Sequence, residues 1–379
     1  MNVALLGFGT VGVGVYELLK QIPDINVAYV LDLKKHDDID AESVTSIEPI
    51  ISDPSVDTVI ELIGGINPAK EFVLKALEAG KNVVTANKFL ICENFTLLSE
   101  KAAEKGVSLR YTAAVGGGIP WLHNLCRICR ISTPDKISGI FNGTTNYILD
   151  KMTKEGSSFE EALKGAQKLG YAEADPSADI DGLDTLRKIV ISANIAFSGV
   201  FNSEDTDLFG IRRITKDDIT FASQHGMVCR LLGTAEKSEN GYSVFVEPAF
   251  VDKNSPFASV TQNYNRISVT SPLQGTVGFY GQGAGRYPTA FTVVSDCIDI
   301  NRGQADPYSE SFVPLEINNS ASAHRYYVRT SLEDKWLSSV AEESFGGAYI
   351  TKCIPVSEMH ENAKRLLGQS DEIFFAEIQ

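Results

Sequence analysis

The sequence predicts an α/β protein whose N-terminal third is built around a parallel sheet. Longer amphipathic segments alternate there with short apolar runs, which lie at residues 3–6, 27–31, 58–62, 82–85 and 107–111. This alternation is typical of consecutive βαβ units. A chain of 379 residues also exceeds what one hydrophobic core usually supports, so we expect two or three domains.

The first apolar run leads directly into the glycine-rich stretch 7–12 (GFGTVG), and a helix is predicted from there to about residue 21. A strand, a G-x-G-x-x-G loop and a helix in this order form the Rossmann dinucleotide-binding fingerprint. The glycines permit a tight turn and a close approach of the pyrophosphate, and the helix N-terminus offers amide donors. We favour this interpretation over an ordinary glycine-rich turn. The motif predicts dinucleotide contacts from Gly7, Gly9, Thr10, Val11 and Gly12.

Asp32 ends the second apolar run, at the distance from the glycines that the fingerprint requires. A carboxylate there accepts a hydrogen bond from the ribose 2′-OH of NAD and repels the 2′-phosphate of NADP. Lys34 and Lys35 follow at once and would help to admit NADP. The sequence therefore predicts NAD as the cofactor, with NADP as the alternative.

Two further loops follow predicted strands at the carboxyl edge of the sheet, where open α/β sheets bind ligands. Gly64 and Gly65 close the third strand, and Lys88 follows the fourth. We assign all three to the cofactor site. The alternative for Lys88 is a solvated surface lysine.

The remaining chain predicts an α+β catalytic and dimerisation domain and a small C-terminal module. A glycine-rich stretch at residues 115–120 is a plausible hinge into the second domain, and a Ser158-x-x-Glu161 capping box opens a helix there. From about residue 325 the pattern reads strand, helix, strand, helix, strand. The predicted domains are residues 1–120 (completed by about 282–305), 121–281 and 320–379.

Asp184 and Lys188 lie one turn apart on a predicted helix and share one face. Ile191 and Ile195 continue that row, while an apolar stripe runs along the opposite side. A helix that is apolar on both sides is buried. The pair is therefore either a structural ion pair or an acid–base pair. A lysine with a carboxylate beside it would hold or protonate the oxygen that gains negative charge during hydride transfer to a carbonyl.

The composition excludes several classes of partner. A net charge of −15 argues against nucleic acids and anionic membranes. The beginning of the chain lacks a basic leader and no apolar run has transmembrane length, so we expect a cytoplasmic protein. The six dispersed cysteines indicate reduced thiols, and Cys126 and Cys129 are interpreted as helix-surface thiols rather than zinc ligands.

Over nearly its whole length the chain resembles homoserine dehydrogenases. The matching stretches are 7–12 (GFGTVG), 61–65 (ELIGG), 84–88 (VTANK), 115–120 (VGGGIP), 142–149 (NGTTNYIL), 170–176 (GYAEADP), 179–188 (DIDGLDTLRK) and 281–285 (GQGAG). The resemblance implies reversible NAD(P)H-dependent reduction of L-aspartate 4-semialdehyde to L-homoserine by a homodimer. It also makes the C-terminal module similar to an ACT domain.

The resemblance implies roles for individual residues. Lys188 corresponds to the proton donor and acceptor, Asp184 to its polar partner, and Lys88 to a lysine that touches nicotinamide and substrate. Glu173 corresponds to the carboxylate that receives the substrate's α-amino group, and Asp179 to a further pocket carboxylate. The remaining implied contacts are Gly285 at the cofactor and the carbonyls of Val115, Gly117 and Ile119 at a Na⁺ or K⁺ ion.

Three positions depart from the family pattern. Thr112 stands where a carboxylate often helps to hold the cation, and Leu31 replaces a basic residue before Asp32, which favours NAD. Residues 334–337 (DKWL) lack the usual Pro-Gly of an ACT effector loop, so regulation by threonine is left open. The alternatives are a related NAD-dependent amino-acid oxidoreductase and an inactive nucleotide-binding sensor.

Overall fold

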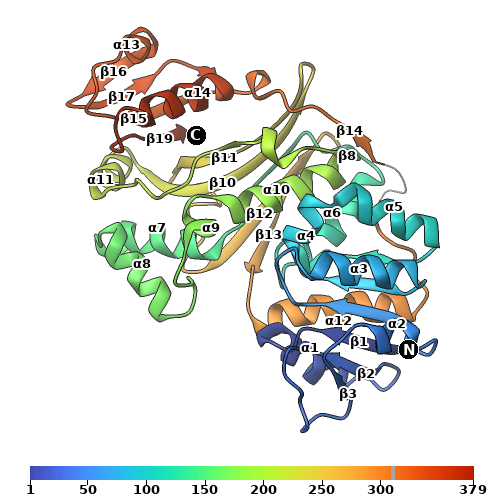
Figure 1. Cartoon of the computed structure of the whole chain (residues 1–379). Helices are drawn as coiled ribbons and strands as arrows, with labels where there is room; N and C mark the ends of the chain where they lie inside the picture. Colours follow the sequence, from blue (N-terminus) through green and yellow to red (C-terminus); the bar gives the residue numbers. More distant parts are fainter. Residues whose placement is uncertain (309–311) are drawn as a thin grey trace. The chain divides into compact units, whose positions relative to one another are not determined.

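The computed structural model describes residues 1–308 and 312–379 (Figure 1). The chain forms two compact units, each built on its own large sheet. Unit 1 comprises residues 1–131, 194–200 and 281–313. Unit 2 comprises residues 132–193, 201–280 and 314–379.

Unit 1 contains a parallel six-stranded sheet in the order β3-β2-β1-β4-β5-β6. This is the strand order of the Rossmann fold, so the predicted fold class of the N-terminal domain is confirmed. Its elements are β1 (Asn2–Leu6), α1 (Thr10–Leu19), β2 (Asn26–Leu31), β3 (Glu42–Val44), α2 (Glu48–Ser52), β4 (Thr58–Glu61), α3 (Ala69–Glu78), β5 (Asn82–Thr85), α4 (Lys88–Glu93), α5 (Phe95–Lys105), β6 (Leu109–Arg110), η1 (Thr112–Ala114), α6 (Trp121–Cys129), β8 (Gly199–Val200) and α12 (Arg286–Asn301).

The core of unit 1 forms where α1 and α12 pack beside the sheet (Figure 1). Val3 and Leu5 of β1 cluster there with Val15 of α1 and with Ala290 and Val293 of α12, all of them buried. Burying these apolar side chains drives the helices onto the sheet. The helix α12 lies in the segment 282–305 that was expected to complete this domain.

Two helices of unit 1 meet at a single residue. The helix α4 ends at Glu93 and α5 begins at Phe95. Asn94 between them has a non-helical φ of −131°, and its side-chain amide donates to the carbonyl of Leu90 at 3.1 Å. An asparagine that bonds to nearby backbone in this way competes with the helical pattern.

Unit 2 contains the second sheet, in the order β13-β12-β7-β10-β11-β19-β15-β17-β16. Its elements are β7 (Lys136–Ile140), α7 (Gly143–Glu155), α8 (Phe159–Lys168), α9 (Ser177–Ile180), η2 (Ser203–Asp205), β9 (Asp207–Leu208), α11 (Lys216–Gln224), β10 (Met227–Ser238), β11 (Gly241–Asp252), β12 (Tyr264–Ser271), η3 (Asn319–Ala321), β15 (Ala323–Arg329), α13 (Lys335–Val340), β16 (Ala341–Phe345), β17 (Ala348–Thr351), β18 (Ile354–Pro355), α14 (Val356–Leu367) and β19 (Phe374–Ile378). Three more elements cross a unit boundary: α10 (Leu183–Ala196), β13 (Gly275–Gln282) and β14 (Val313–Pro314).

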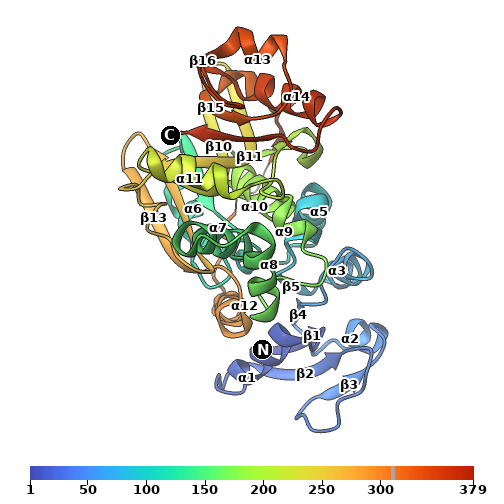
Figure 2. The same cartoon turned by 90° about the vertical axis from the view of Figure 1, so that its left-hand side faces the viewer.

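The helices α7 and α8 lie side by side in unit 2 (Figure 2). Asn142 begins α7 by accepting a hydrogen bond from the backbone N–H of Thr145. The capping box predicted at Ser158 and Glu161 is confirmed, since each side chain accepts from the other residue's backbone N–H. Such reciprocal bonds satisfy donors that a helix start leaves unpaired.

The helix α10 is buried on both sides, as its pattern predicted. Val190, Ile191 and Ala193 are fully buried, although Leu183 at the helix start is exposed and does not continue the expected apolar stripe. The interpretation of Cys126 as a helix-surface thiol is wrong, because its side chain is buried in α6. Burial accordingly raises the pKa of that thiol to about 12.

The C-terminal residues extend the sheet of unit 2 instead of forming a separate sheet. β19 pairs in parallel with β11 and antiparallel with β15. The order of its elements is β15-α13-β16-β17-β18-α14-β19, which apart from the two-residue strand β18 is that of a ferredoxin-like motif. The sequence pattern did not reveal β16 or β18. The similarity to an ACT domain stays a prediction.

The unit boundaries differ from the predicted domain boundaries. Unit 1 continues to residue 131, beyond the glycine-rich segment at 115–120, and unit 2 includes the C-terminal module. Among the helices of the described residues, none has the length and apolar character needed to cross a membrane.

Candidate active site

In unit 1 the glycine loop of the predicted cofactor site is packed too closely to accept side chains. Gly7 has a φ of +97°, and its N–H donates to the carbonyl of Leu31 at 2.8 Å. A Cβ added to Gly12 would lie 2.2 Å from the carbonyl oxygen of Gly7, so only glycine lets α1 start this close to the strand. At Gly9 an added Cβ would meet nothing within 4 Å, which leaves the space that a pyrophosphate needs. Thr10 and Val11 form the first turn of α1.

Asp32 lies at the end of β2, beside this loop. Its carboxylate accepts hydrogen bonds from the backbone N–H groups of Phe8 at 2.9 Å and Leu33 at 2.6 Å. Burial alone would raise the pKa of Asp32, but the backbone donors Phe8, Leu33 and Lys34 together lower it. The carboxylate is therefore ionised at the rim of the glycine loop, as the assignment to the ribose of NAD requires.

A buried carboxylate connects the loops that follow β4 and β5. Glu61 accepts from the N–H groups of Ile63 at 2.9 Å and Gly64 at 3.1 Å, and from the Thr85 hydroxyl at 2.6 Å. Asn87 donates to Glu61 at 3.4 Å and to the Gly65 carbonyl at 2.6 Å. Burial raises the pKa of Glu61 above its ordinary value, and these donors offset part of that rise by stabilising the charged form.

Three of the predicted cofactor residues lie in or directly after the loops that this network connects. Gly64 and Gly65 both have positive φ values, and Lys88 is the first residue of α4, capped by the side chain of Asn87. The sequence motif contained Glu61 and Asn87, but neither had been assigned a role. A polar residue at the end of a fully buried strand was the available signal.

The glycine-rich segment after β6 packs against the chain near α12. The Gly117 carbonyl accepts from the Thr292 hydroxyl at 2.7 Å, and the Ile119 carbonyl accepts from the N–H of Trp121 at 2.7 Å. Gly285 is the residue that precedes α12, with a φ of +126°. In the described part of the chain no group of three or more His, Cys, Asp or Glu side chains could hold a metal ion. Backbone carbonyls such as those of Val115, Gly117 and Ile119 are oxygen ligands of the kind that can bind Na⁺ or K⁺.

In unit 2 the predicted acid–base pair is present and buried. The Lys188 ammonium donates to Asp184 at 2.7 Å and to the Phe141 carbonyl at 2.7 Å. Both charged side chains are less than a tenth exposed. An ammonium that is buried to this degree must be held by charged or polar oxygens, and here it is.

Asn142 connects this pair to a second carboxylate. Its side-chain amide donates to Asp179 at 2.7 Å and to Asp184 at 2.8 Å. Burial and then the negative charge of Asp184 raise the pKa of Asp179, while the Asn142 amide lowers it. The β7–α7 junction thus supplies two groups, Phe141 and Asn142, that sequence spacing had not connected to α10.

The surroundings of Glu173 differ from those of this cluster. It is exposed, on the loop between α8 and α9, whereas Asp179, Asp184 and Lys188 are brought together by hydrogen bonds. An exposed carboxylate on a loop can accept a ligand's ammonium without a large desolvation penalty. Its assigned role stays a prediction.

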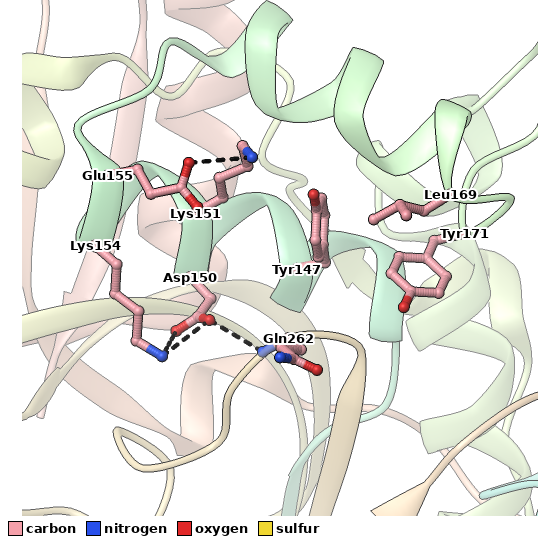
Figure 3. A pocket seen from close by; sticks show the side chains of 8 residues that line it. All are labelled: Tyr147, Asp150, Lys151, Lys154, Glu155, Leu169, Tyr171 and Gln262. Carbon is pink, nitrogen blue, oxygen red and sulfur yellow. Dashed lines mark hydrogen bonds and ion pairs between the residues drawn. The ribbon is translucent and has the colours of Figure 1, made fainter.

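A pocket of about 300 Å³ opens between α7, α8 and the loop at Gln262 (Figure 3). Its charged side chains are paired with one another, Lys154 with Asp150 and Lys151 with Glu155. None of the predicted site residues lines it. The pocket is therefore no part of the candidate active site.

A Rossmann sheet with a closed glycine turn and a buried lysine–carboxylate cluster in the second unit define a dinucleotide-dependent oxidoreductase. Two family models match the chain, "Homoserine dehydrogenase, NAD binding domain" over residues 7–112 and "Homoserine dehydrogenase" over residues 120–298. The chain belongs to the homoserine dehydrogenase family.

Individual relatives agree with the family models. A homoserine dehydrogenase from Synechocystis is 42% identical over 316 residues, which are 79% of this chain and 73% of that protein. The Bacillus subtilis enzyme is 40% identical over 314 residues, 79% of this chain and 72% of its own. The solved structure of a homoserine dehydrogenase from Thiobacillus denitrificans matches with a TM-score of 0.90 at 29% identity, covering 100% of this chain and 98% of its own.

Proposed function

We propose that this homoserine dehydrogenase reduces L-aspartate 4-semialdehyde reversibly to L-homoserine, with Lys188 as the proton donor and acceptor at the substrate oxygen. The observation that carries the proposal is the buried ammonium between Asp184 and the Phe141 carbonyl. A general acid must have its proton at a fixed atom close to the reacting group. The Asp184 carboxylate and the Phe141 carbonyl hold the Lys188 ammonium in one position, which supports this role.

The dinucleotide, when bound, supplies the hydride for reduction or accepts it in the reverse direction. In reduction, Lys188 gives a proton to the aldehyde oxygen as that oxygen gains negative charge, and it takes the proton back from the alcohol in oxidation. Asp184 keeps the ammonium oriented, and Asn142 fixes the Asp179 and Asp184 carboxylates relative to each other. We assign the substrate's α-amino group to Glu173 and Asp179, because an ammonium is bound best by carboxylates.

We assign the dinucleotide to the glycine loop, Asp32, Gly64, Gly65, Lys88 and Gly285. Asp32 favours NAD over NADP, because its ionised carboxylate accepts from a ribose hydroxyl and repels a phosphate. Lys34 and Lys35 are exposed beside it and keep NADP as the alternative. Lys88 is assigned to the nicotinamide end.

The proposed test is oxidation of NADH and of NADPH by the purified protein with L-aspartate 4-semialdehyde. Succinic semialdehyde is the matched control, since it lacks the α-amino group that Glu173 and Asp179 are assigned to bind. We expect fast turnover with the amino-acid aldehyde and slow turnover with the control. Preference for another amino-acid aldehyde would favour the related oxidoreductase, and dinucleotide binding without turnover would favour the inactive sensor.

Three properties implied by the family need separate measurements. The Na⁺ or K⁺ site at Val115, Gly117 and Ile119 predicts faster turnover in these salts than in choline chloride. The expected homodimer is checked by light scattering of the full chain. Addition of threonine tests whether the C-terminal module regulates the enzyme.

A further inference from the structure

We propose that His36 is a specificity-determining residue for the cofactor, which improves the binding of NADP relative to NAD as the pH falls. The inference rests on the proposed function in one respect, the assignment of the adenosine ribose to Asp32. It concerns a histidine that neither the fingerprint nor the assigned site includes.

His36 is held beside the glycine loop by contacts on two sides. Its backbone N–H donates to the hydroxyl of Ser43 in β3 at 2.9 Å. Its ring packs on Phe8, the second residue of the glycine loop, with ring centroids 4.8 Å apart. Phe8 in turn donates its N–H to Asp32 at 2.9 Å. The imidazole therefore has a fixed position next to the cofactor carboxylate.

The decisive distance is between His36 Nε2 and Asp32 Oδ2, which is 3.6 Å. This is too long for a good hydrogen bond, and Nε2 is buried without a hydrogen-bond partner among the described residues. It is nevertheless close enough for strong attraction once the ring is charged. Both side chains are about a quarter exposed, at 26% and 24%, so a ligand can reach them.

Asp32, four residues earlier in the same connection between β2 and β3, is the charged group that faces His36. Phe8 and Ser43, its other contacts, are uncharged, and Tyr16 lies behind Phe8 with ring centroids 5.6 Å apart. The flanking charges in the sequence are Lys34, Lys35, Asp37 and Asp38, all of them exposed. Protonation of His36 therefore acts mainly on the field at Asp32.

The two protonation states of His36 favour different cofactors. With a neutral ring, the Asp32 charge is uncompensated, which suits a ribose hydroxyl and repels a 2′-phosphate. With a protonated ring, the positive charge offsets Asp32 and attracts the phosphate of NADP. Histidine is the side chain whose charge ordinarily changes in the range of about pH 5 to 8. The preference for NAD should therefore weaken toward acidic pH.

The test measures the dissociation constants of NADH and NADPH by cofactor fluorescence at about pH 6 and about pH 8, for the wild type and for His36→Gln. The 2′-phosphate itself titrates near pH 6, and both proteins experience that effect equally. We expect the NADPH-to-NADH ratio of dissociation constants to fall by up to about fivefold more in the wild type than in the variant, as a partly exposed ion pair allows. His225→Gln, an exposed histidine in unit 2, is the matched control and should behave as the wild type.

An identical pH dependence in the wild type and His36→Gln would overturn the proposal. In Asp32→Asn the NADPH-to-NADH ratio of dissociation constants should be small at both pH values. A large ratio in this variant would also contradict the proposal. Failure of the cofactor assignment on which this proposal rests looks different. In that case neither cofactor binds at either pH, in any of the variants, whereas loss of turnover alone leaves the binding ratios measurable.

Discussion

Lys188 has its ammonium between a carboxylate and a backbone carbonyl instead of in water. The two nitrogen–oxygen distances of 2.7 Å show that the charge is fully paired. A lysine on the surface would have many orientations and no fixed partner. Here the surrounding groups limit the proton to one position, which is what general acid catalysis requires.

Lys188→Ala should reduce turnover by about 10²–10⁴-fold, since a positioned general acid contributes that much. Binding of NADH should stay nearly unchanged, because Lys188 lies in unit 2 and the glycine loop in unit 1. Steady-state kinetics with aspartate semialdehyde and NADH titration measure the two effects. Lys168→Ala, an exposed lysine of α8, is the control. Unchanged turnover in Lys188→Ala would remove this residue from the mechanism.

Glu173→Ala should chiefly raise the KM for aspartate semialdehyde. The carboxylate is assigned to the α-amino group, which is present in the substrate and in the transition state alike, so its loss weakens both equally. Kinetics at saturating cofactor separate KM from kcat, and Glu160→Ala, exposed on α8, is the control. A variant with normal KM and low kcat would contradict this role.

At the scale of residues, the sequence predicted contacts between side chains one helical turn apart but not contacts between residues far apart in the chain. The Asp184–Lys188 ion pair was predicted from a spacing of one helical turn and is confirmed. Asn142, which bonds to both Asp179 and Asp184, lies 37 and 42 residues away from them in the chain. Sequence periodicity cannot predict these hydrogen bonds, because they form only when the start of α7 packs near α9 and α10 in the folded chain.

At the scale of elements, the cofactor site depends on where strands end. β4 and β5 are adjacent parallel strands, so Glu61 and Thr85 at their carboxyl ends lie side by side. The Glu61 carboxylate therefore binds the turn at Gly64 and, through Asn87, the start of α4. A single buried side chain thus connects two loops that follow different strands.

Glu61→Gln should weaken NADH binding and lower stability together. The new amide would place its NH₂ group either toward the Thr85 hydroxyl or toward the Asn87 amide and the loop N–H groups, which bond to the other carboxylate oxygen. Unsatisfied buried donors cost about 1–3 kcal/mol. Urea unfolding measures the free energy, and NADH titration measures the affinity. Glu78→Gln, exposed at the end of α3, is the control. Normal stability and affinity in Glu61→Gln would show that the network does not position these loops.

The predicted elements were most accurate where a short apolar run is fully buried. The strands at residues 3–6, 58–62 and 82–85 match β1, β4 and β5 within a residue. Long strands are harder to delimit: the apolar run at residues 242–246 predicts only the N-terminal part of β11, Gly241–Asp252. Its burial on both faces removes the alternating pattern by which strands are recognised.

At the scale of the whole molecule, the C-terminal module is joined to the catalytic unit by pairing that the sequence could not reveal. The parallel pairs Ala249–Glu377 and Phe250–Ile378 join residues more than a hundred positions apart. Aromatic side chains then fill the junction, with Tyr327 packed on Phe221 and Phe250. The three predicted parts therefore become two compact units.

The same junction contains a buried acid and a buried base. His360 of α14 lies 2.8 Å from Glu247 of β11, and Tyr326 donates to the same carboxyl group at 3.3 Å. Burial lowers the pKa of His360 to about 4. Burial, and secondarily the charge of Glu377, raise the pKa of Glu247 well above its ordinary value. In the folded protein the pair therefore holds one proton. The Glu247 carboxyl group carries this proton, and the His360 ring is neutral.

The pH dependence of stability follows from these two shifts. The depressed pKa of His360 costs stability as the pH falls from about 6.5 toward 4, and the raised pKa of Glu247 costs stability as the pH rises above about 4.3. The two slopes cancel between about pH 4.3 and 6.5. Above that range only the Glu247 contribution remains, because the unfolded chain has released both protons and the folded chain retains one.

Glu247→Gln should therefore lose less stability than the wild type between about pH 7 and pH 9, by up to about 1.4 kcal/mol per pH unit. Urea unfolding at several pH values measures the slope, which is independent of any constant loss that the substitution causes by repacking. Glu343→Gln, exposed on β16, should retain the wild-type slope. Parallel curves for the wild type and Glu247→Gln would mean that the folded pair holds no proton in this pH range, so that Glu247 is ionised beside a neutral His360.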